Sequence, residues 1–294
     1  MGRELAAQFP AAREAFAEAD DLLGFSLSKL AWEGPEAELT QTHNAQPAIL
    51  VHSIAVYRAV AEHIGDVAVA AGHSLGEFSA YVAAGTLSFA DAVRTVRRRG
   101  ELMLRSGHER PGTMAAILGL DDEAAERVCR DATAESGECV PANYNSPGQI
   151  VISGDVHAVG RAIELAKAVG AKRALPLSVS GAFHSPLMAP SVAGLEAQLS
   201  TVEINNPKFP VVSNVTAQPV TDAVSARRLL LEQLTSPVRW TACVRRMREM
   251  GADTFIELGP GNVLTGLLKR IDRDASGRAI GTLQDVQSTV SADV

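Results

Sequence analysis

The sequence of 294 residues contains little cysteine and no long hydrophobic run. Its three cysteines, Cys129, Cys139 and Cys243, are odd in number and lack metal-ligand spacing, which argues against a disulfide framework or a metal site and is typical of reduced thiols in the cytoplasm. No apolar stretch reaches the roughly 18–20 residues of a membrane span, and no signal peptide is recognisable. We therefore expect a cytoplasmic protein that neither crosses a membrane nor carries a metal.

Positive charge is also scarce. Lysine and arginine number 27 against 34 aspartates and glutamates, which gives a formal net charge of −7. A chain with this balance lacks the electrostatic attraction that drives nonspecific binding to nucleic acid. Hydrophobic residues, by contrast, make up 46% of the chain, which is ample for one large domain or a domain with an insertion.

The order of strand-like and helix-like segments predicts an α/β fold with an inserted second domain. Residues 113–180 show the order β-α-β-β-α-β, which is the ferredoxin-like pattern. Strands and helices alternate on either side of it, so residues 1–112 and 181–294 are expected to form a large α/β core with a mostly parallel sheet. The expected helices lie at 3–22 with a break at Pro10, 46–64, 89–104, 121–133, 156–169 and 186–199. Two more helices are expected within 222–250, and a last one follows the strand at 254–258 and ends at about residue 270. The expected strands lie at 67–71, 114–120, 140–143, 149–153, 171–179, 209–214 and 254–258.

Ser74 lies in the run Gly72-His73-Ser74-Leu75-Gly76, between the expected strand at 67–71 and a helix-like run at 78–84. A serine on a strand-to-helix turn takes a strained backbone, and the flanking glycines leave room for it. The turn points the first helical N–H groups at any negative charge that grows beside the hydroxyl. This arrangement suits acyl transfer through a covalent serine ester; the alternative is an ordinary turn of glycine and serine.

A serine nucleophile needs a base, and His184 is the best-placed histidine. It lies in the run 180–186, where the inserted domain returns to the core, and sites often lie between domains. The alternative is that His184 only caps or packs beneath the following helix. His73 adjoins Ser74 but is expected to point to the opposite face, and His52 is expected to be a packed core residue. The histidines expected to be solvated are His43, His63, His108 and His157.

The order of these residues excludes an ordinary α/β-hydrolase. In that fold the histidine follows the nucleophile and the acid and lies near the C-terminus, whereas no histidine follows His184 here. The group that orients His184 must therefore come from elsewhere. A backbone or amide carbonyl can do this in place of a carboxylate.

Seven motifs, taken in order, resemble those of malonyl-CoA:acyl-carrier-protein transacylases and of the acyltransferase domains of polyketide synthases. The resemblance covers almost the whole chain and implies a hydrolase-like core with a ferredoxin-like insertion, in agreement with the segment order. The motifs are Gln46-Pro47-Ala48; Gly72-His73-Ser74-Leu75-Gly76-Glu77; Arg99-Gly100 with Met103; Asn143-Tyr144-Asn145-Ser146-Pro147-Gly148-Gln149; Gly181-Ala182-Phe183-His184-Ser185; Gln233-Leu234 with Pro237-Val238 and Trp240; and Glu257-Leu258-Gly259-Pro260-Gly261.

The resemblance also implies a role for each matching residue. Ser74 would be the nucleophile that takes the malonyl group from coenzyme A. His184 would be its base, and later the acid that protonates the leaving thiol. The main-chain carbonyl of Gln233 would hold His184, and the N–H of Leu75 would be an oxyanion donor.

Arg99 resembles the arginine that grips the free carboxylate of the malonyl group. A planar guanidinium offers two parallel donors to a carboxylate and stays charged. The alternative is a solvated helix face, since Arg97 and Arg98 are neighbours and only one of the three can point inward. Gln46 would line the same pocket.

Phe183 and Leu75 resemble the residues found at these positions in malonyl-preferring acyltransferase domains. A bulky Phe183 would leave little space for a methyl branch on the substrate, which fits this preference. The implied enzyme is a malonyl-CoA:ACP S-malonyltransferase that acts on malonyl-CoA and an acyl carrier protein, with no cofactor, and we expect a monomer. Basic residues would dock the acidic carrier; the candidates are Arg97, Arg98, Lys269 and Arg270. The sequence leaves open whether the pathway makes fatty acids or polyketides.

The sequence departs from the family's pattern at its N-terminus. The family begins with a strand and a Gly-Gln-Gly-Ser-Gln turn, whereas this sequence starts at Met1-Gly2, just past that turn. The first strand, and the glutamine whose N–H is the second oxyanion donor, are therefore expected to be missing, at a cost of ~10²–10³ in turnover. A misassigned start is the favoured explanation. The alternative explanation is a degraded or truncated copy with little activity. For the function, the alternatives to malonyl transfer are a serine hydrolase or thioesterase that acts on uncharged esters or thioesters, or an inactive truncated acyltransferase.

Overall fold

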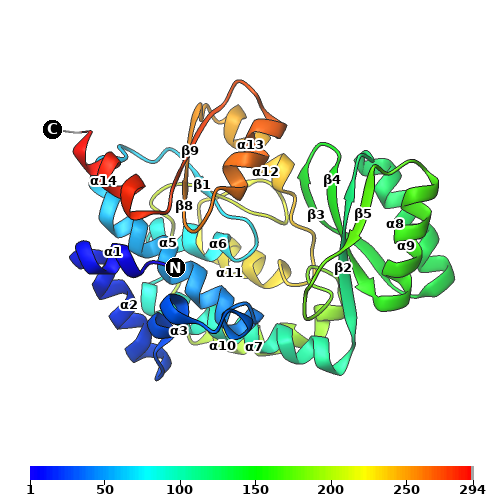
Figure 1. Ribbon diagram of the computed structural model, residues 1–294, viewed down its shortest axis with the longest axis horizontal. Helices are drawn as coiled ribbons and strands as arrows, with labels where there is room; N and C mark the ends of the chain where they lie inside the picture. Colours follow the sequence, from blue (N-terminus) through cyan, green and yellow to red (C-terminus); the bar gives the residue numbers. More distant parts are fainter. Residues whose placement is uncertain (293–294) are drawn as a thin grey trace.

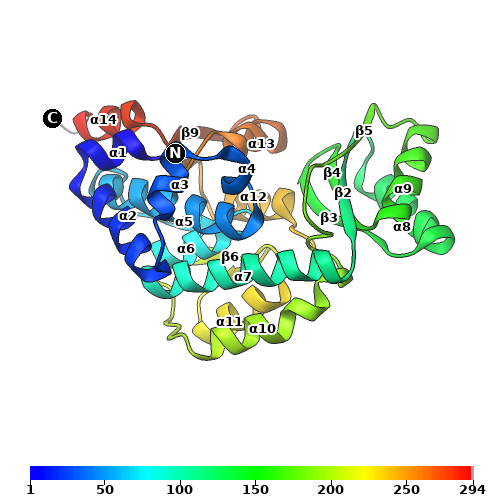
Figure 2. The same ribbon diagram turned by 60° about the horizontal axis from the view of Figure 1, so that its bottom comes forward.

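The computed structural model describes residues 1–292 and arranges them in two bodies (Figure 1). The larger body is mostly helical, and the smaller one, formed by the middle of the chain, contains an antiparallel sheet. Helix α7 (Phe89–Glu109) runs from the larger body to the smaller one (Figure 2). Within the described residues, no helix combines the length and the apolar character that crossing a membrane requires.

Two prolines shape the N-terminal helices. Helix α1 (Arg3–Gln8) ends before Pro10, which begins α2 (Pro10–Leu23), so the expected break is confirmed. Helix α5 (Thr42–Val60) begins before the expected start at Gln46 and contains Pro47. Pro47 has no N–H for the carbonyl of His43, and Arg97 Nη1 donates to that oxygen at 3.1 Å. The short elements around α5 are α3 (Leu27–Glu33), α4 (Glu36–Leu39) and a 3₁₀ turn at Ala61–His63.

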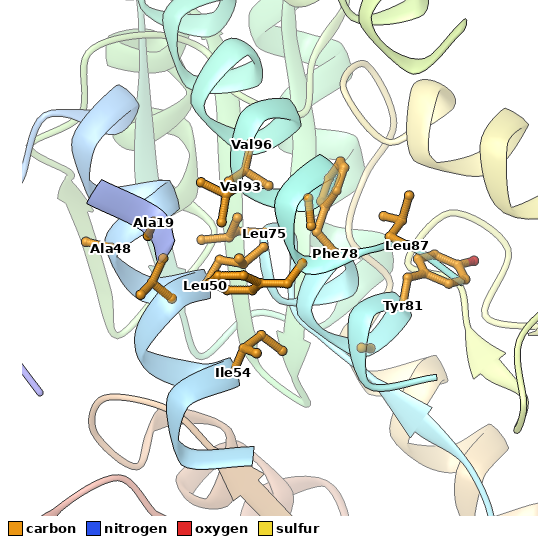
Figure 3. Close-up of a cluster of buried hydrophobic side chains, with 14 of the residues drawn as sticks. Ala19, Ala48, Leu50, Ile54, Leu75, Phe78, Tyr81, Leu87, Val93 and Val96 are labelled. Atoms are coloured by element: carbon orange, nitrogen blue, oxygen red, sulfur yellow. The ribbon is translucent and has the colours of Figure 1, made fainter. Parts of the chain in front are cut away.

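The main core lies where α5, α6 (Gly76–Ala83) and α7 pack together. Ser88 caps α7, because its Oγ accepts a hydrogen bond from the N–H of Asp91 at 3.0 Å. Leu50, Phe78 and Val93 contribute buried side chains from the three helices (Figure 3). Burial of one such side chain contributes roughly 1.5–3 kcal/mol, so this packing fixes the helix that follows Ser74.

Within residues 1–292, the larger body contains two small sheets. Strand β1 (Ala70–Ala71) pairs in parallel with β6 (Val211–Val212), which pairs antiparallel with β7 (Pro219–Val220). Strand β8 (Thr254–Leu258) pairs in parallel with β9 (Ser276–Ile280). The α/β class is confirmed, but the strands expected at 67–71 and 209–214 are too long. An apolar run does not specify how many of its residues find a partner strand.

The smaller body is a four-stranded antiparallel sheet in the order β3-β4-β2-β5. Two helices cover the face that is turned away from the larger body (Figure 1), and a separate core with Ile117, Ile150 and Ile152 lies beneath them. The elements are β2 (Gly112–Leu118), α8 (Asp122–Ser136), β3 (Cys139–Ser146), β4 (Gln149–Asp155), α9 (Val156–Ala168) and β5 (Arg173–Pro176). The ferredoxin-like order is therefore confirmed, while the domain boundaries at 112/113 and 180/181 stay a prediction.

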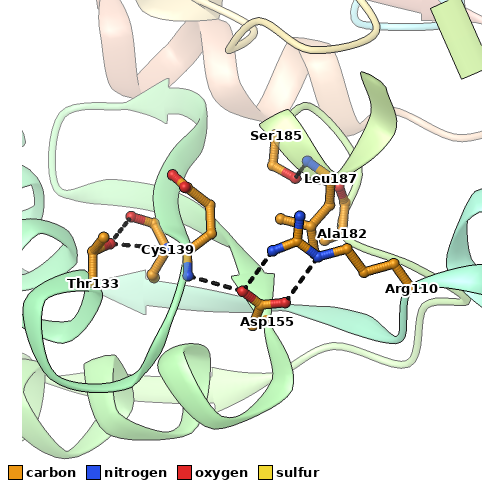
Figure 4. Close-up of polar contacts among 8 residues, drawn as sticks. Arg110, Thr133, Cys139, Asp155, Ala182, Ser185 and Leu187 are labelled. Atoms are coloured by element: carbon orange, nitrogen blue, oxygen red, sulfur yellow. Dashed lines mark hydrogen bonds and ion pairs between the residues drawn. The ribbon is translucent and has the colours of Figure 1, made fainter. Parts of the chain in front are cut away.

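Contacts at several places join the bodies. Arg110, which follows α7, donates from Nη2 to Asp155 Oδ2 at 3.0 Å (Figure 4). In β3, the N–H of Tyr144 donates to the carbonyl of Val238 at 2.9 Å, and the N–H of Val238 donates to Ala142 at 2.8 Å. The other elements of the larger body are a 3₁₀ turn at Pro186–Met188, α10 (Ala189–Ser200), α11 (Ala223–Glu232), α12 (Trp240–Glu249), α13 (Val263–Ile271) and α14 (Leu283–Ser291).

Candidate active site

Ser74 lies on a tight turn between β1 and α6. Its φ of 51° falls in the left-handed region, which residues other than glycine rarely adopt. Gly72 makes the turn possible, because a Cβ at that position would lie 1.9 Å from the backbone of Gly76. Backbone strain of this kind is concentrated at functional sites.

Asn214, which the sequence analysis misses, braces this turn. Its Oδ1 accepts from the N–H of Ser74 at 2.7 Å, and its Nδ2 donates to the carbonyl of Gly72 at 2.8 Å. Asn214 is fully buried and comes soon after β6, the parallel partner of β1. One signal was available, since Asn214 ends the strand expected at 209–214, and ligand sites gather at the carboxyl ends of parallel strands.

His184 lies against Ser74 although 110 residues separate them. The distance from Ser74 Oγ to His184 Nε2 is 2.7 Å. Across the ring, Nδ1 lies 2.9 Å from the main-chain oxygen of Gln233 and 3.2 Å from that of Ser236. Carbonyl oxygens only accept, so Nδ1 carries the proton and Nε2 presents its lone pair to the hydroxyl of Ser74.

The surroundings of His184 keep its imidazole neutral. Burial, followed by the positive charge of Arg99, lowers the pKa of His184 to about 3. Ser185 shapes the turn that carries the ring, because its Oγ donates to the carbonyl of Ala182 at 2.6 Å and accepts from the N–H of Leu187 at 3.3 Å (Figure 4). A neutral histidine held in one tautomer can take a proton from a hydroxyl without first losing one.

Arg99 is the one arginine of its run that is buried, with 1% of its surface exposed. Its Nη1 donates to Gln46 Oε1 at 2.6 Å, and its Nη2 donates to Gln233 Oε1 at 3.0 Å and to Ser74 Oγ at 3.2 Å. Burial lowers the pKa of Arg99 to about 10, which leaves the guanidinium charged near neutral pH. A charged fork of donors beside a hydroxyl can bind an anionic group there.

Gln233 contributes its side chain as well as its carbonyl, which the sequence analysis does not anticipate. Its Nε2 donates to the carbonyl of Ser74 at 3.1 Å and to Glu77 Oε2 at 2.6 Å. Burial raises the pKa of Glu77 to about 7. The available signal for Glu77 is a carboxylate in the otherwise apolar run that follows Ser74.

Leu75 directly follows Ser74 in the sequence, and Phe183 directly precedes His184. The side chain of Leu75 belongs to the main core (Figure 3), so only its main chain can face the reacting atoms. Within the described residues, the N–H of Leu75 has no hydrogen-bond acceptor. Phe183 packs against Met114 and Val151 of the smaller body.

The other histidines lie away from the Ser74 hydroxyl. His73 makes a 2.8 Å contact from Nε2 to Asn145 Oδ1, and His52 is buried in the helical body as expected. Of the four histidines expected to be solvated, His108 and His157 are exposed, whereas His43 and His63 are half-buried. Among residues 1–292, no cluster of side chains suited to hold a metal ion is found.

The basic residues expected to dock a carrier differ in their surroundings. Arg97 pairs with Glu101 at 2.8 Å, and Arg98 pairs with the same carboxylate at 3.6 Å. Arg270 Nη1 donates to Gln149 Oε1 at 3.0 Å, from α13 to the smaller body, and Lys269 is exposed. Their docking role stays a prediction.

Comparison with known proteins assigns the chain to a family. The sequence profile of the acyl transferase domain family matches residues 1–290. The chain belongs to the acyl transferase domain family. The resemblance stated from the seven motifs is thereby confirmed, and the chain is an acyltransferase.

Relatives of this acyltransferase share most of its length. The malonyl CoA-acyl carrier protein transacylase of Bacillus subtilis (strain 168) is 48% identical over 290 residues, which cover 99% of this chain and 92% of the relative. The protein of the same name from Escherichia coli (strain K12) is 47% identical over 272 residues, which cover 92% of this chain and 88% of the relative.

Solved structures of similar acyltransferases match the fold closely. An acyl carrier protein S-malonyltransferase from Vibrio cholerae superposes with a TM-score of 0.93 at 44% identity, covering 98% of this chain and 94% of that one. A malonyl-transacylase in complex with a type II PKS acyl-carrier protein superposes with a TM-score of 0.95 at 43% identity, covering 99% and 94%.

Proposed function

We propose that this acyltransferase moves a malonyl group from coenzyme A to the phosphopantetheine thiol of an acyl carrier protein through a covalent ester on Ser74. The observation that carries the proposal is the charged Arg99 guanidinium 3.2 Å from Ser74 Oγ, where it offers a partner for the free carboxylate of a malonyl group. The names of the relatives support this donor, and the complex with a carrier protein supports this acceptor.

In the first half-reaction, Ser74 Oγ attacks the thioester carbonyl carbon while His184 Nε2 takes the hydroxyl proton. The N–H of Leu75, at the start of α6, would donate to the negative carbonyl oxygen. The C–S bond then breaks, and the imidazolium returns the proton to the sulfur of coenzyme A. The carbonyl of Gln233 accepts from Nδ1 in both protonation states of the ring.

The second half-reaction is the reverse of the first with a different thiol. The carrier thiol gives its proton to His184 Nε2 and attacks the malonyl ester carbon. The C–O bond to Ser74 breaks, and the serine oxygen recovers the proton from the imidazolium. The proton and the acyl group are both accounted for without a cofactor, and the kinetics are ping-pong.

The substrate's own carboxylate would also strengthen the base. In the empty site, the charge of Arg99 acts together with burial to hold the pKa of His184 low. A malonyl carboxylate bound to Arg99 would offset that charge and raise the pKa of His184. An uncharged acyl group lacks this effect, so the site favours malonyl over acetyl in both binding and proton transfer.

Intact-mass analysis after brief mixing with malonyl-CoA tests the proposal. We expect a malonyl adduct on the wild type and none on Ser74→Ala. Ser79→Ala is a matched control, because Ser79 lies on the same helix with a buried hydroxyl that has no partner among the described residues. Adding an acyl carrier protein should move the malonyl group from the enzyme to the carrier.

Three outcomes would contradict the proposal. Fast release of free malonate without a carrier would indicate a serine hydrolase or thioesterase. A folded protein that forms no adduct and releases no malonate would indicate a chain without catalytic activity. Equal labelling of the wild type and Ser74→Ala would place the ester on another residue.

A further inference from the structure

Glu77 is a fully buried carboxylate that the mechanism above does not use. Its Oε2 accepts from Gln233 Nε2 at 2.6 Å and from the N–H of Asn214 at 3.2 Å. Its Oε1 has no hydrogen-bond partner among the described residues. Burial of a carboxylate with an unpaired oxygen costs folding free energy, so the residue calls for a functional explanation.

The Gln233 amide lies between Glu77 and Arg99, and its two ends differ. Nε2 uses both protons, one toward Glu77 Oε2 and one toward the carbonyl of Ser74 at 3.1 Å. Oε1 accepts from Arg99 Nη2 at 3.0 Å. The reversed amide would set its oxygen against the carboxylate and its NH₂ against the guanidinium. Every one of these contacts would then be unfavourable.

The Gln233 amide also separates the carboxylate of Glu77 from the opposite charge of Arg99. Across residues 1–292, no side-chain carboxylate lies within ion-pair distance of Arg99; instead, the neutral oxygens of Gln46 and Gln233 accept from its two terminal nitrogens. A direct ion pair with Glu77 would satisfy the guanidinium and compete with an incoming carboxylate. With the amide between them, Glu77 fixes the direction of the hydrogen bonds and Arg99 keeps its charge available.

We propose that Glu77 is a positioning residue for substrate selection, which fixes the Gln233 amide so that its oxygen holds Arg99 ready for the carboxylate of the acyl donor. This inference rests on the proposed malonyl transfer and adds a residue that touches neither the substrate nor the reacting atoms. His184 depends on the main-chain carbonyl of Gln233 rather than on its side chain. Loss of Glu77 should therefore impair recognition of the charged acyl group more than the chemistry at Ser74.

The test compares acylation of Ser74 by malonyl-CoA and by acetyl-CoA, which lacks the carboxylate. It is run at pH 8, above the pKa of about 7 that burial gives Glu77. Glu77→Met, which neither accepts nor carries charge, should lower the malonyl-to-acetyl ratio of kcat/KM about tenfold or more. Acetyl transfer should fall by a smaller factor than malonyl transfer, since the Ser74–His184 contact itself does not involve Glu77.

Two further variants give rescue and control. Glu77→Gln retains an acceptor for Gln233 Nε2 and should recover most of the malonyl preference. Tyr81→Phe removes a buried hydroxyl one turn further along α6 that has no partner among the described residues, and should leave the ratio unchanged. A general loss of helix packing would instead lower both substrates' rates together.

The inference is overturned if folded Glu77→Met keeps the wild-type ratio. Should Glu77→Met fail to fold, Gln233→Met takes its place, because it keeps the main-chain carbonyl and removes the amide; an unchanged ratio there overturns the inference too. Failure of the proposed function looks different. In that case the wild type itself forms no malonyl ester, or Arg99→Ala leaves the ratio unchanged.

Discussion

At the scale of single residues, the site depends on the buried charge of Arg99. Arg99 contacts the nucleophile directly, and its charge lowers the pKa of His184 in addition to the effect of burial. The same guanidinium is thus the proposed binding partner of the substrate carboxylate and a charge that weakens His184 as a base. Recognition and proton transfer are therefore coupled through one side chain.

This coupling predicts a change in the pH dependence of acylation by acetyl-CoA. His184 accepts the serine proton only when neutral, and its pKa of about 3 keeps it neutral through the acid range. Arg99→Met removes a positive charge, which raises the pKa of His184 and moves the acid limb of kcat/KM to higher pH. Burial still lowers the pKa in the variant, so stopped-flow acylation from about pH 3 to 8 should show the loss of rate beginning at a higher pH in the variant than in the wild type. Superimposable profiles would contradict the coupling, and Arg98→Met is the matched control.

At the scale of elements, the turn between β1 and α6 depends on a close backbone approach. A Cβ on Gly72 would lie 1.9 Å from the backbone of Gly76, whereas a Cβ on Gly160 of α9 meets nothing within 4 Å. Gly72→Ala should lower the free energy of unfolding by about 3 kcal/mol or more. Gly160→Ala should raise it by up to about 1 kcal/mol. Urea denaturation measures both, and a Gly72→Ala protein as stable as the wild type would show that the turn is looser than described.

Elements with local signals could be predicted from the sequence, and others could not. Helix α7 was predicted from residue 89, although it extends to Glu109 rather than ending near Leu104. Strand β9 and helix α14 lie in a polar tail where the apolar signal is weak, so they were missed. Lengths of strands depend on partners that are distant in sequence, and no local pattern reports them.

The residues of the site also divide into those with a local sequence signal and those without one. Ser74, His184 and Arg99 stand in recognisable motifs, and the structure brings all three together. Asn214 and Glu77 act through hydrogen bonds to residues more than a hundred positions away. Such pairings follow from the packing of whole elements, so sequence spacing alone could not identify them.

At the scale of the whole molecule, the smaller body interrupts the chain between two halves of the site. Ser74 and Arg99 precede it, and His184 and Gln233 follow it. Its strand β3 is hydrogen-bonded to Val238, close to the carbonyls that hold the histidine. The insertion could be predicted from segment order, but the place where it docks could not, because contacts between the bodies have no local signature.

The most direct measurement is the malonyl-to-acetyl ratio of acylation rate constants in Arg99→Ala, with Arg98→Ala as the matched control on the same helix. Hydrogen bonds to a charged group are strong, so the ratio in Arg99→Ala should fall about a hundredfold. Arg98 is half exposed and pairs with Glu101, so Arg98→Ala should keep the wild-type ratio. A ratio in Arg99→Ala equal to that of the wild type would contradict the claim that this buried guanidinium selects the substrate.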